Sequence, residues 1–406
     1  MIVHSYRARR FGVAAAVTAA ALVLGGCAAN PEPTTSGAAP DDLADFEPIT
    51  IMYASPLPET NTQGASEVAF IEYIEDKTDG KVTFERYFAG ALFPAPEAIS
   101  GVQNGLAQIA TAGPIYSPNE LPVGSWGMSL GLQQAGDSGP YGQLQAYLAS
   151  YDFLQQNEDI NAEFAGLGLR PLMPYTGTQY GLSCSDPIST LDQAAGKTTS
   201  SLPIWAPEVE ALGMTVTYIP ATEAYEALQR GVVDCVVGSL AGHASISLYE
   251  VAPYWLPLDM RNTVGMVRPM MSLEVWESLP AAVQKIFAQA ELHALQAFVE
   301  GDFSGSADVL KGGDTYQIAD VSALNAELAK ITPGLLAELA GSAPDAVTDP
   351  QAAIDGYGGA LEEWGSVLEG LGAAPSDDWA TGVEAGPSLP IAAAFDALRQ
   401  KYNLAE

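Results

Sequence analysis

The residue types that most often carry catalytic chemistry are few in this chain, and their spacing does not suit catalysis. Three histidines occur in 406 residues, at His4, His243 and His293. No phosphate-binding GxxxxGK[ST] loop, no HExxH zinc motif and no Gly-x-Ser-x-Gly nucleophile elbow occurs in a strand–turn–helix context. Separate histidines form neither a metal site nor a triad without supporting geometry, and the carboxylates are too abundant to pair as acid and base. We therefore expect no enzymatic activity, no cofactor and no metal.

The charge balance is strongly acidic and excludes several classes of partner. The chain has 16 Lys and Arg against 49 Asp and Glu, which gives a formal net charge of −33. Nucleic-acid binding requires clustered basic residues, and so does binding to anionic lipid through a basic patch. The hydrophobic content of 48% is typical of a folded protein, and the length allows two lobes with separate cores.

The N-terminal segment predicts export. Arg7, Arg9 and Arg10 precede an apolar run at 11–24, which is too short for an ordinary membrane-spanning helix. The following LGGC at 24–27 resembles the lipobox of bacterial lipoproteins, in which Cys27 is lipidated and becomes the first mature residue. A plain signal peptide is the alternative, and the paired arginines leave the twin-arginine export route open. Residues 28–46 are rich in Pro, Ala, Thr, Ser and Asp, which favours a disordered tether.

Two cysteines remain after processing, Cys184 and Cys235. An exported protein folds in an oxidising compartment, so an even pair predicts a disulfide. Two buried free thiols are the alternative.

One segment, residues 218–239, predicts a strand, a short helix and a second strand. Gly231 is placed to end the helix in the left-handed conformation, and the valines at 232, 233, 236 and 237 predict a buried strand. The loop after the first strand of such a unit often borders a binding crevice. RGVVDC at 230–235 parallels NGLAQI at 104–109, and we interpret the two as one supersecondary unit used once in each of two lobes.

The order of short motifs along most of the chain resembles the solute-binding proteins of tripartite ATP-independent periplasmic (TRAP) transporters. These motifs are TDGKV at 78–82, NGLAQ at 104–108, DPI at 186–188, LDQAAGK at 191–197, ALG at 211–213, EAYEALQRGVVD at 223–234, LYEVA at 248–252 and WESLP at 276–280. The tail beyond about residue 310 does not fit the family pattern and is extended relative to it.

The resemblance implies an α/β fold of the periplasmic-binding-protein type II class, with two lobes of mixed sheets flanked by helices. It divides the chain into a signal peptide at 1–26, a tether at 27–47, lobe I at 48–172 and 257–275, lobe II at 173–256, and a spanning helix with an extended helical region at 276–406. The lobes would close on a small ligand and dock on the membrane subunits of a TRAP-type permease. We expect a monomer, held at the outer face of the cytoplasmic membrane or in the periplasm by lipid on Cys27, with no nucleic-acid partner.

The chain departs from the family where relatives clamp a carboxylate. In the family, an arginine at the end of a G-x-K-x-R strand binds the ligand carboxylate through two hydrogen bonds. Here Ser200 stands at that position. A second family arginine would fall near Gln179 or Tyr180, and the family asparagine falls on Gly238. Burying an unpaired carboxylate is costly, so we expect a neutral, polyol-like or cationic ligand.

The candidate binding residues are aromatic or polar. Rings could stack on the ligand, Glu59 or Glu223 could meet an ammonium group, and His243 could face the cleft. The full set of candidates is Glu59, Tyr116, Trp126, Tyr175, Tyr180, Ser200, Trp205, Glu223, Tyr225, Gly238 and His243, with Tyr53 as a further ring. Each aromatic could instead pack in the core, and Glu223 could instead serve only the helix start.

Two alternative functions remain at this level. An organic acid could still bind through Arg170, Arg261 or Arg268 from another strand. The cleft could also belong to a lipid-anchored sensor that signals to a membrane partner.

Overall fold

The computed structural model describes residues 43, 46–135, 139–177, 180–220, 223–312, 315–376 and 378–405. The predicted signal peptide, Cys27 and most of the tether lie outside this part of the chain, as do Gln179 and Thr222. No helix in the described ranges is long and apolar enough to cross a membrane.

Lobe I is built on a five-stranded mixed sheet with the order β2-β1-β3-β10-β4. Its strands are β1 (Ile49–Ala54), β2 (Val82–Tyr87), β3 (Ile109–Ala112), β4 (Leu169–Pro171) and β10 (Arg268–Ser272). The first three strands along the chain are parallel, and β10 runs antiparallel to both β3 and β4. Because β10 is supplied from much later in the sequence, the chain returns to lobe I after building lobe II.

Lobe II is built on a six-stranded mixed sheet with the order β11-β9-β5-β8-β6-β7. Its strands are β5 (Tyr180–Cys184), β6 (Thr198–Ser200), β7 (Thr215–Thr217), β8 (Cys235–Ser239), β9 (Tyr254–Leu256) and β11 (Gln317–Ile318). Strands β6, β7 and β8 are parallel, whereas β5 is antiparallel to β8 and β9. The short β11 pairs with β9, so the C-terminal region contributes an edge strand to this sheet.

The predicted disulfide is confirmed. Cys184 on β5 and Cys235 on β8 lie directly opposite each other in the antiparallel ladder and are bonded, with a sequence separation of 51 residues. Both side chains are fully buried.

The expected helix stop and strand after residue 230 are only partly correct. Gly231 has a φ of +68°, so its predicted left-handed conformation is confirmed. The strand, however, begins at Cys235, and the side chain of Val232 is 57% exposed. The prediction of burial for Val232 was wrong because the chain still turns there, with the Val232 N–H donating back to the Ala227 carbonyl.

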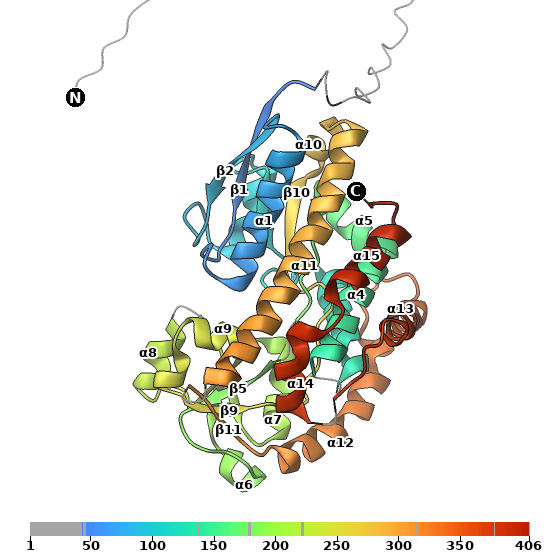
Figure 1. Cartoon of the computed structure of the whole chain (residues 1–406). Coiled ribbons are helices and arrows are strands. Elements are labelled where there is room, and N and C mark those ends of the chain that lie inside the picture. Colours follow the sequence, from blue (N-terminus) through green and yellow to red (C-terminus); the bar gives the residue numbers. More distant parts are fainter. Residues whose placement is uncertain are drawn as a thin grey trace, which may run out of the picture. The chain divides into compact units, whose positions relative to one another are not determined.

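The spanning helix α11 (Ala281–Gly312) connects the lobes, packing on α1 (Thr62–Lys77) beside the first sheet and on α9 (Leu240–Ser245) beside the second (Figure 1). The spanning helix expected from residue 276 begins at Ala281, directly after Pro280, and extends to Gly312. The residue before this proline, Leu279, has an extended ψ of 138°, which separates α11 from α10 (Leu273–Ser278). One helix therefore packs against elements of both lobes.

The remaining helices cover the sheets and form the C-terminal region. In chain order they are α2 (Ala98–Gln103), α3 (Pro122–Met128), α4 (Pro140–Gln156), α5 (Glu158–Gly166), α6 (Leu191–Ala194), α7 (Ala206–Ala211), α8 (Ala224–Gln229), α12 (Ser322–Leu339), α13 (Pro350–Gly370), α14 (Trp379–Ala385) and α15 (Ile391–Lys401).

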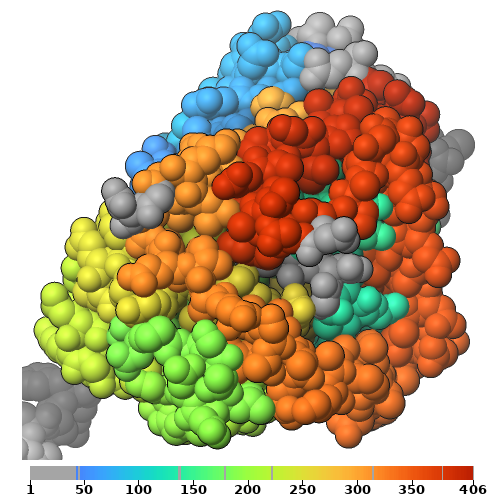
Figure 2. All heavy atoms as spheres, turned by 60° about the horizontal axis from the view of Figure 1, so that its bottom comes forward, coloured from blue at the N-terminus to red at the C-terminus, as the bar shows by residue number. Residues whose placement is uncertain are grey.

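The C-terminal region packs closely on the rest of the protein. Helices α13 and α15 lie on α4, and α14 lies on α11. Buried Trp364 donates from Nε1 to Asp152 Oδ2 at 3.2 Å, and Lys401 Nζ bonds the same carboxylate at 2.6 Å. Figure 2 shows residues of this region, orange to red, forming a broad continuous part of the surface. The extension is therefore an integral layer of the fold.

Candidate ligand-binding cleft

A cavity of ≈ 180 Å³ lies where segments of both lobes meet. Strands β6 and β8 are parallel, and the cavity is bordered by the carboxyl ends of β6 and β7 and by the segment that follows β3. This is the edge at which ligands bind in open α/β sheets. The described lining residues are Ile115, Tyr116, Tyr180, Ser200, Ser201, Leu202, Trp205, Tyr218, Ile219, Ala224, Val236, Val237, His243, Ile246, Leu248 and Met266.

Aromatic rings form much of the cavity wall. Tyr180 at the start of β5 stacks on Trp205, with ring centres 4.3 Å apart and planes inclined by 30°. Trp205 is held from behind, because its Nε1 donates to the Arg261 carbonyl at 3.2 Å. Tyr116 lies on the lobe I side, and Tyr218 is 57% exposed. The wall therefore combines a buried, stacked ring pair with one exposed ring.

The polar groups of the cavity are uncharged. Burial raises the pKa of the Tyr116 hydroxyl to about 12, and it also raises the pKa of Tyr180. Burial lowers the pKa of His243 to about 4, which a hydrogen bond to the Val237 backbone only partly offsets. His243 is therefore neutral at physiological pH. No described lining residue is an aspartate, glutamate, lysine or arginine.

Two residues stand at positions where the family has its acid clamp, Ser200 and Gly238, and both make contacts within lobe II. The Ser200 hydroxyl accepts from the Ile219 N–H at 3.1 Å and lies 3.4 Å from the Ile219 carbonyl oxygen. A Cβ added at Gly238 would lie 2.1 Å from His243 Nε2, so glycine leaves the space that the imidazole fills. His243 is fixed in turn by a 2.7 Å hydrogen bond between Nδ1 and Ser183 Oγ.

Of the binding candidates from the sequence, Tyr116, Tyr180, Ser200, Trp205 and His243 line the cavity together. Gly238 lies directly behind this lining, against His243. Sequence reasoning missed Tyr218 and Met266 as lining residues. Tyr218 follows the end of β7, and that position at a strand end was the available signal. Met266 precedes β10, and nothing local in the sequence marks it.

Three other candidates make contacts outside the described lining. Trp126 is buried and donates from Nε1 to the Leu339 carbonyl at 2.9 Å, which ties α3 to α12. Tyr175 is buried with its hydroxyl 2.6 Å from Ser66 Oγ. Tyr225 donates to Glu250 at 2.8 Å.

The two acidic candidates are exposed. Glu223 lies at the start of α8 and Glu59 in the loop before α1. Neither carboxylate lines the described cavity.

The three arginines considered for an acid ligand lie elsewhere. Arg261 forms a buried two-bond ion pair with Glu208, with N–O distances of 2.5 and 3.1 Å. Arg170 pairs with Glu291 at 3.1 Å and lies over the ring of Trp276. Arg268 donates through Nε and Nη2 to the Leu172 carbonyl, and burial lowers its pKa to about 10.

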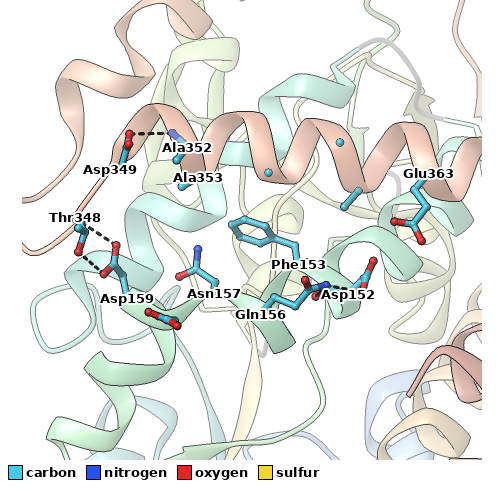
Figure 3. Close-up of a pocket in the computed structure, with 14 residues that line it drawn as sticks. Asp152, Phe153, Gln156, Asn157, Asp159, Thr348, Asp349, Ala352, Ala353 and Glu363 are labelled. Atoms are coloured by element: carbon cyan, nitrogen blue, oxygen red, sulfur yellow. Dashed lines mark hydrogen bonds between the residues drawn. The ribbon is translucent and has the colours of Figure 1, made fainter. Parts of the chain in front are cut away.

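A larger groove of ≈ 500 Å³ lies between α4, α5 and α13 (Figure 3). Apart from Phe153, the residues of its floor are small alanines and glycines, and the residues of its rim are mostly acidic. Two of the rim carboxylates are already engaged, since Asp159 accepts from Thr348 at 2.7 Å and Asp152 bonds Lys401. We prefer the interlobe cavity as the ligand site because it is lined by rings and buried polar groups from both lobes. No group of His, Cys, Asp and Glu able to hold a metal occurs in the described ranges.

Comparisons with known proteins give a consistent result. Residues 53–299 match the family described as bacterial extracellular solute-binding protein, family 7. The ectoine-binding periplasmic protein TeaA of Halomonas elongata is 26% identical over 207 residues, which are 50% of this chain and 57% of that protein. A solute-binding protein of Sulfitobacter sp. NAS-14.1 is 28% identical over 261 residues, covering 59% of this chain and 74% of that protein. The matched part thus spans little more than half of the ectoine-binding relative.

Solved structures agree on the fold. A marine metagenome TRAP solute-binding protein in complex with pyroglutamate superposes with a TM-score of 0.64 at 18% identity, covering 77% of this chain and 100% of that structure. The structure of the Halomonas elongata ectoine-binding protein superposes with a TM-score of 0.60 at 19% identity, covering 78% and 100%.

Proposed function

Because this chain belongs to family 7 of the bacterial extracellular solute-binding proteins, we propose that it captures a small organic solute between its lobes and delivers it to a TRAP-type permease. Members of this family are extracytoplasmic solute receptors rather than enzymes. The observation that carries the proposal is the aromatic cavity bordered by both lobes, with Tyr116 on one side and the Tyr180–Trp205 pair on the other. Closure around a ligand would exclude water and strengthen each polar contact inside.

We further propose that the ligand is not a simple carboxylate. The cavity lining contains no described cationic side chain, and a buried carboxylate without a cation is costly. Ser200 bonds the Ile219 backbone, and Gly238 accommodates neutral His243, so neither supplies a positive charge. Two of the arginines considered for an acid ligand are also engaged elsewhere, since Arg170 and Arg261 pair with buried glutamates.

Identification of the co-purified solute tests this function. Native mass spectrometry of the exported protein, followed by denaturation and analysis of the released molecule, should give one small organic solute. Adding it back to ligand-free protein should raise the melting temperature by mass action. Gly238→Ala should abolish the shift, because the new Cβ displaces His243 from the cavity wall. Stabilisation by mono- and dicarboxylates alone would overturn the assignment of a non-carboxylate ligand.

Membrane attachment and delivery need separate tests. Lipid on Cys27 would hold the receptor beside the permease, and metabolic labelling with a fatty-acid analogue should label the wild type and not Cys27→Ala. In proteoliposomes that contain the membrane subunits, uptake of the identified solute should require this protein. Uptake without it would contradict the receptor role.

A further inference from the structure

The C-terminal region places one buried side chain, Tyr316, against lobe II. Tyr316 directly precedes β11, the strand that joins the edge of the second sheet beside β9. Gln317 lies opposite Tyr254 in that pairing, and the Ala319 N–H donates to the Trp255 carbonyl at 2.9 Å, so backbone bonds fix this segment on the sheet. Tyr316 lies beyond the residues that match the family, so the match assigns it no role.

Two hydrogen bonds lead from Tyr316 to the cavity wall. The Ser183 hydroxyl donates to the Tyr316 hydroxyl oxygen at 3.3 Å, and the same Ser183 oxygen lies 2.7 Å from His243 Nδ1. All three side chains are buried, and His243 lines the cavity. Buried polar groups need hydrogen-bond partners, and removing one partner leaves the next group unsatisfied. Ser183 therefore links a residue of the C-terminal region to a residue of the cavity.

Ring contacts connect the same residues. The fully buried ring of Trp255 packs edge to face against His243, with ring centres 5.9 Å apart, and against Tyr316 at 6.1 Å. The imidazole also fills the space that Gly238 leaves. His243 is therefore connected to Tyr316 by two routes, one hydrogen-bonded through Ser183 and one packed through Trp255.

The hydroxyl hydrogen of Ser183 gives this link a chemical consequence. A neutral imidazole has one N–H donor and one acceptor nitrogen, and its hydrogen-bond partners decide which nitrogen carries the proton. Ser183 has a single hydrogen, and both the Tyr316 oxygen and His243 Nδ1 lie within reach of it. When Tyr316 accepts that hydrogen, Ser183 is left to accept from Nδ1–H. Tyr316 thus favours the Nδ1–H form of His243, in which Nε2 is the acceptor.

We infer that Tyr316 is a positioning residue, by which the C-terminal region fixes the orientation and the protonated nitrogen of His243 in the cavity wall and so sets the affinity for the solute. This inference rests on the proposed solute-binding function and adds a determinant of affinity from outside the part of the chain that matches the family. Tyr316 is not among the described lining residues, so its effect passes through Ser183, Trp255 and His243.

NMR of the imidazole nitrogens in ligand-free full-length protein tests the positioning without a solute. The nitrogen shifts distinguish the two neutral tautomers, and His243→Gln identifies the signals of His243 among the three histidines. Tyr316→Phe removes only the hydroxyl that accepts from Ser183, so it should shift His243 toward the Nε2–H form. Ser183→Ala removes both bonds and should also change the shifts. Unchanged shifts in Tyr316→Phe would overturn the inference.

Calorimetric titration with the solute released from purified wild-type protein measures the consequence for binding. Tyr316→Phe should weaken the affinity about three- to tenfold, since one buried hydrogen bond is lost, and Ser183→Ala about tenfold or more, since both are lost. The control is Tyr249→Phe, which removes the same atom from a ring packed on Tyr316 at 6.0 Å. It should leave both the affinity and the ring shifts of His243 unchanged. A melting curve of each variant checks that the fold is retained.

The outcomes also separate this inference from the proposed function. Changed ring shifts in Tyr316→Phe with unchanged affinity would limit Tyr316 to a structural role and overturn the inference, while the receptor function would stand. Equal losses of affinity in Tyr316→Phe and Tyr249→Phe would contradict it as well, because the effect would then belong to the ring cluster and not to the hydrogen bond. If the wild-type protein neither releases nor binds a solute, the receptor function fails, and the ring shifts alone decide whether Tyr316 positions His243.

Discussion

The sheets of the two lobes share the same strand order and directions, but equivalent positions carry different kinds of side chain. Strands β2, β1, β3, β10 and β4 of lobe I correspond in order and direction to β7, β6, β8, β5 and β9 of lobe II. In both sheets, the side chain of the residue before the central strand accepts a hydrogen bond from the backbone of the adjacent strand. Gln108 Oε1 accepts from the Met52 N–H at 2.9 Å, and Asp234 Oδ2 accepts from the Thr198 N–H at 2.7 Å. The repeated unit inferred from 104–109 and 230–235 thus has the same role in each sheet.

The next position shows where the lobes diverge. Ile109 on β3 lies opposite Met271 on β10, and the equivalent pair in lobe II is Cys235 opposite Cys184. At this point the two strands of lobe I are held together by apolar packing, and those of lobe II by a disulfide bond. The difference shows that the fold specifies which positions face each other, while the side chains decide how they hold together.

The largest expected effect on the free energy of unfolding comes from variants at these two strand pairs. Replacing both Cys184 and Cys235 by serine should lower the free energy of unfolding by about 4 kcal/mol, because the bond restrains a long loop in the unfolded chain. Ile109→Ala in lobe I should cost about 2–5 kcal/mol through the cavity it leaves. Chemical denaturation with and without reductant measures both losses in the free energy of unfolding. Reductant should destabilise the wild type and Ile109→Ala but not the double serine variant, and equal sensitivity in all three would contradict a stabilising bond.

A second contrast concerns two buried glutamates: Glu67 in lobe I has no ion pair with a described residue, whereas Glu208 in lobe II pairs with Arg261. The native pKa of Glu67 is about 7, above its ordinary 4.5, so the folded state holds this proton more tightly than the unfolded chain. Stability should therefore fall as pH rises from about 4.5 to about 7, by on the order of 3 kcal/mol from this group. Glu67→Gln should remove that part of the decline.

Lobe II provides the control for this prediction. Glu208→Gln breaks the ion pair with buried Arg261, so it should destabilise the protein. Unfolding measured across the pH range in the absence of ligand compares the two variants. A pH profile of Glu67→Gln that matches the wild type would argue against the raised pKa.

A smaller effect compares the two residues that fix the neighbouring strand. Gln108→Ala and Asp234→Ala each leave a backbone N–H without its acceptor, which should cost about 1–3 kcal/mol. The loss should be greater for Asp234, which also bonds Lys197 at 3.2 Å. Equal losses at high and low salt would show that the charge of Asp234 adds nothing.

The smallest effect on stability is expected at the cavity, where Tyr218→Ala removes an exposed ring. The free energy of unfolding should change by less than about 0.5 kcal/mol, whereas affinity for the identified solute should fall about tenfold. Tyr225→Ala is the matched control, because Tyr225 lies on the same lobe outside the described lining. Similar affinity in both variants would remove Tyr218 from the site.

Much of the fold could be predicted from local patterns in the sequence. Gly231 marked the end of a helix because a left-handed residue is needed there. The spanning helix begins at Ala281 and not at residue 276, because Pro280 disfavours helix at the residue before it. Val232 was misassigned, since an apolar side chain in a turn has the same sequence signal as one in a strand. The pairing of β11 with β9 carried no signal, because a two-residue strand has no periodicity.

The cavity was predictable in part. Tyr116, Tyr180 and Trp205 were candidates because their rings could stack on a ligand, but Trp126 and Tyr175 met the same criterion and make core contacts instead. Ring chemistry is identical in both settings. Only the packing of neighbouring elements decides whether a ring faces a cavity or the interior.

The sequence by itself determined the family, the acidic character, the disulfide pair and the absence of an arginine at Ser200, since each depends on residue type and order along the chain. The tertiary structure decided that Ser200 bonds Ile219, that His243 fills the space above Gly238, and that Glu67 and Asp302 are buried without an ion pair to a described residue. These facts arise from contacts between segments far apart in sequence. Burial and pairing are properties of such contacts, and residue order along the chain does not reveal them.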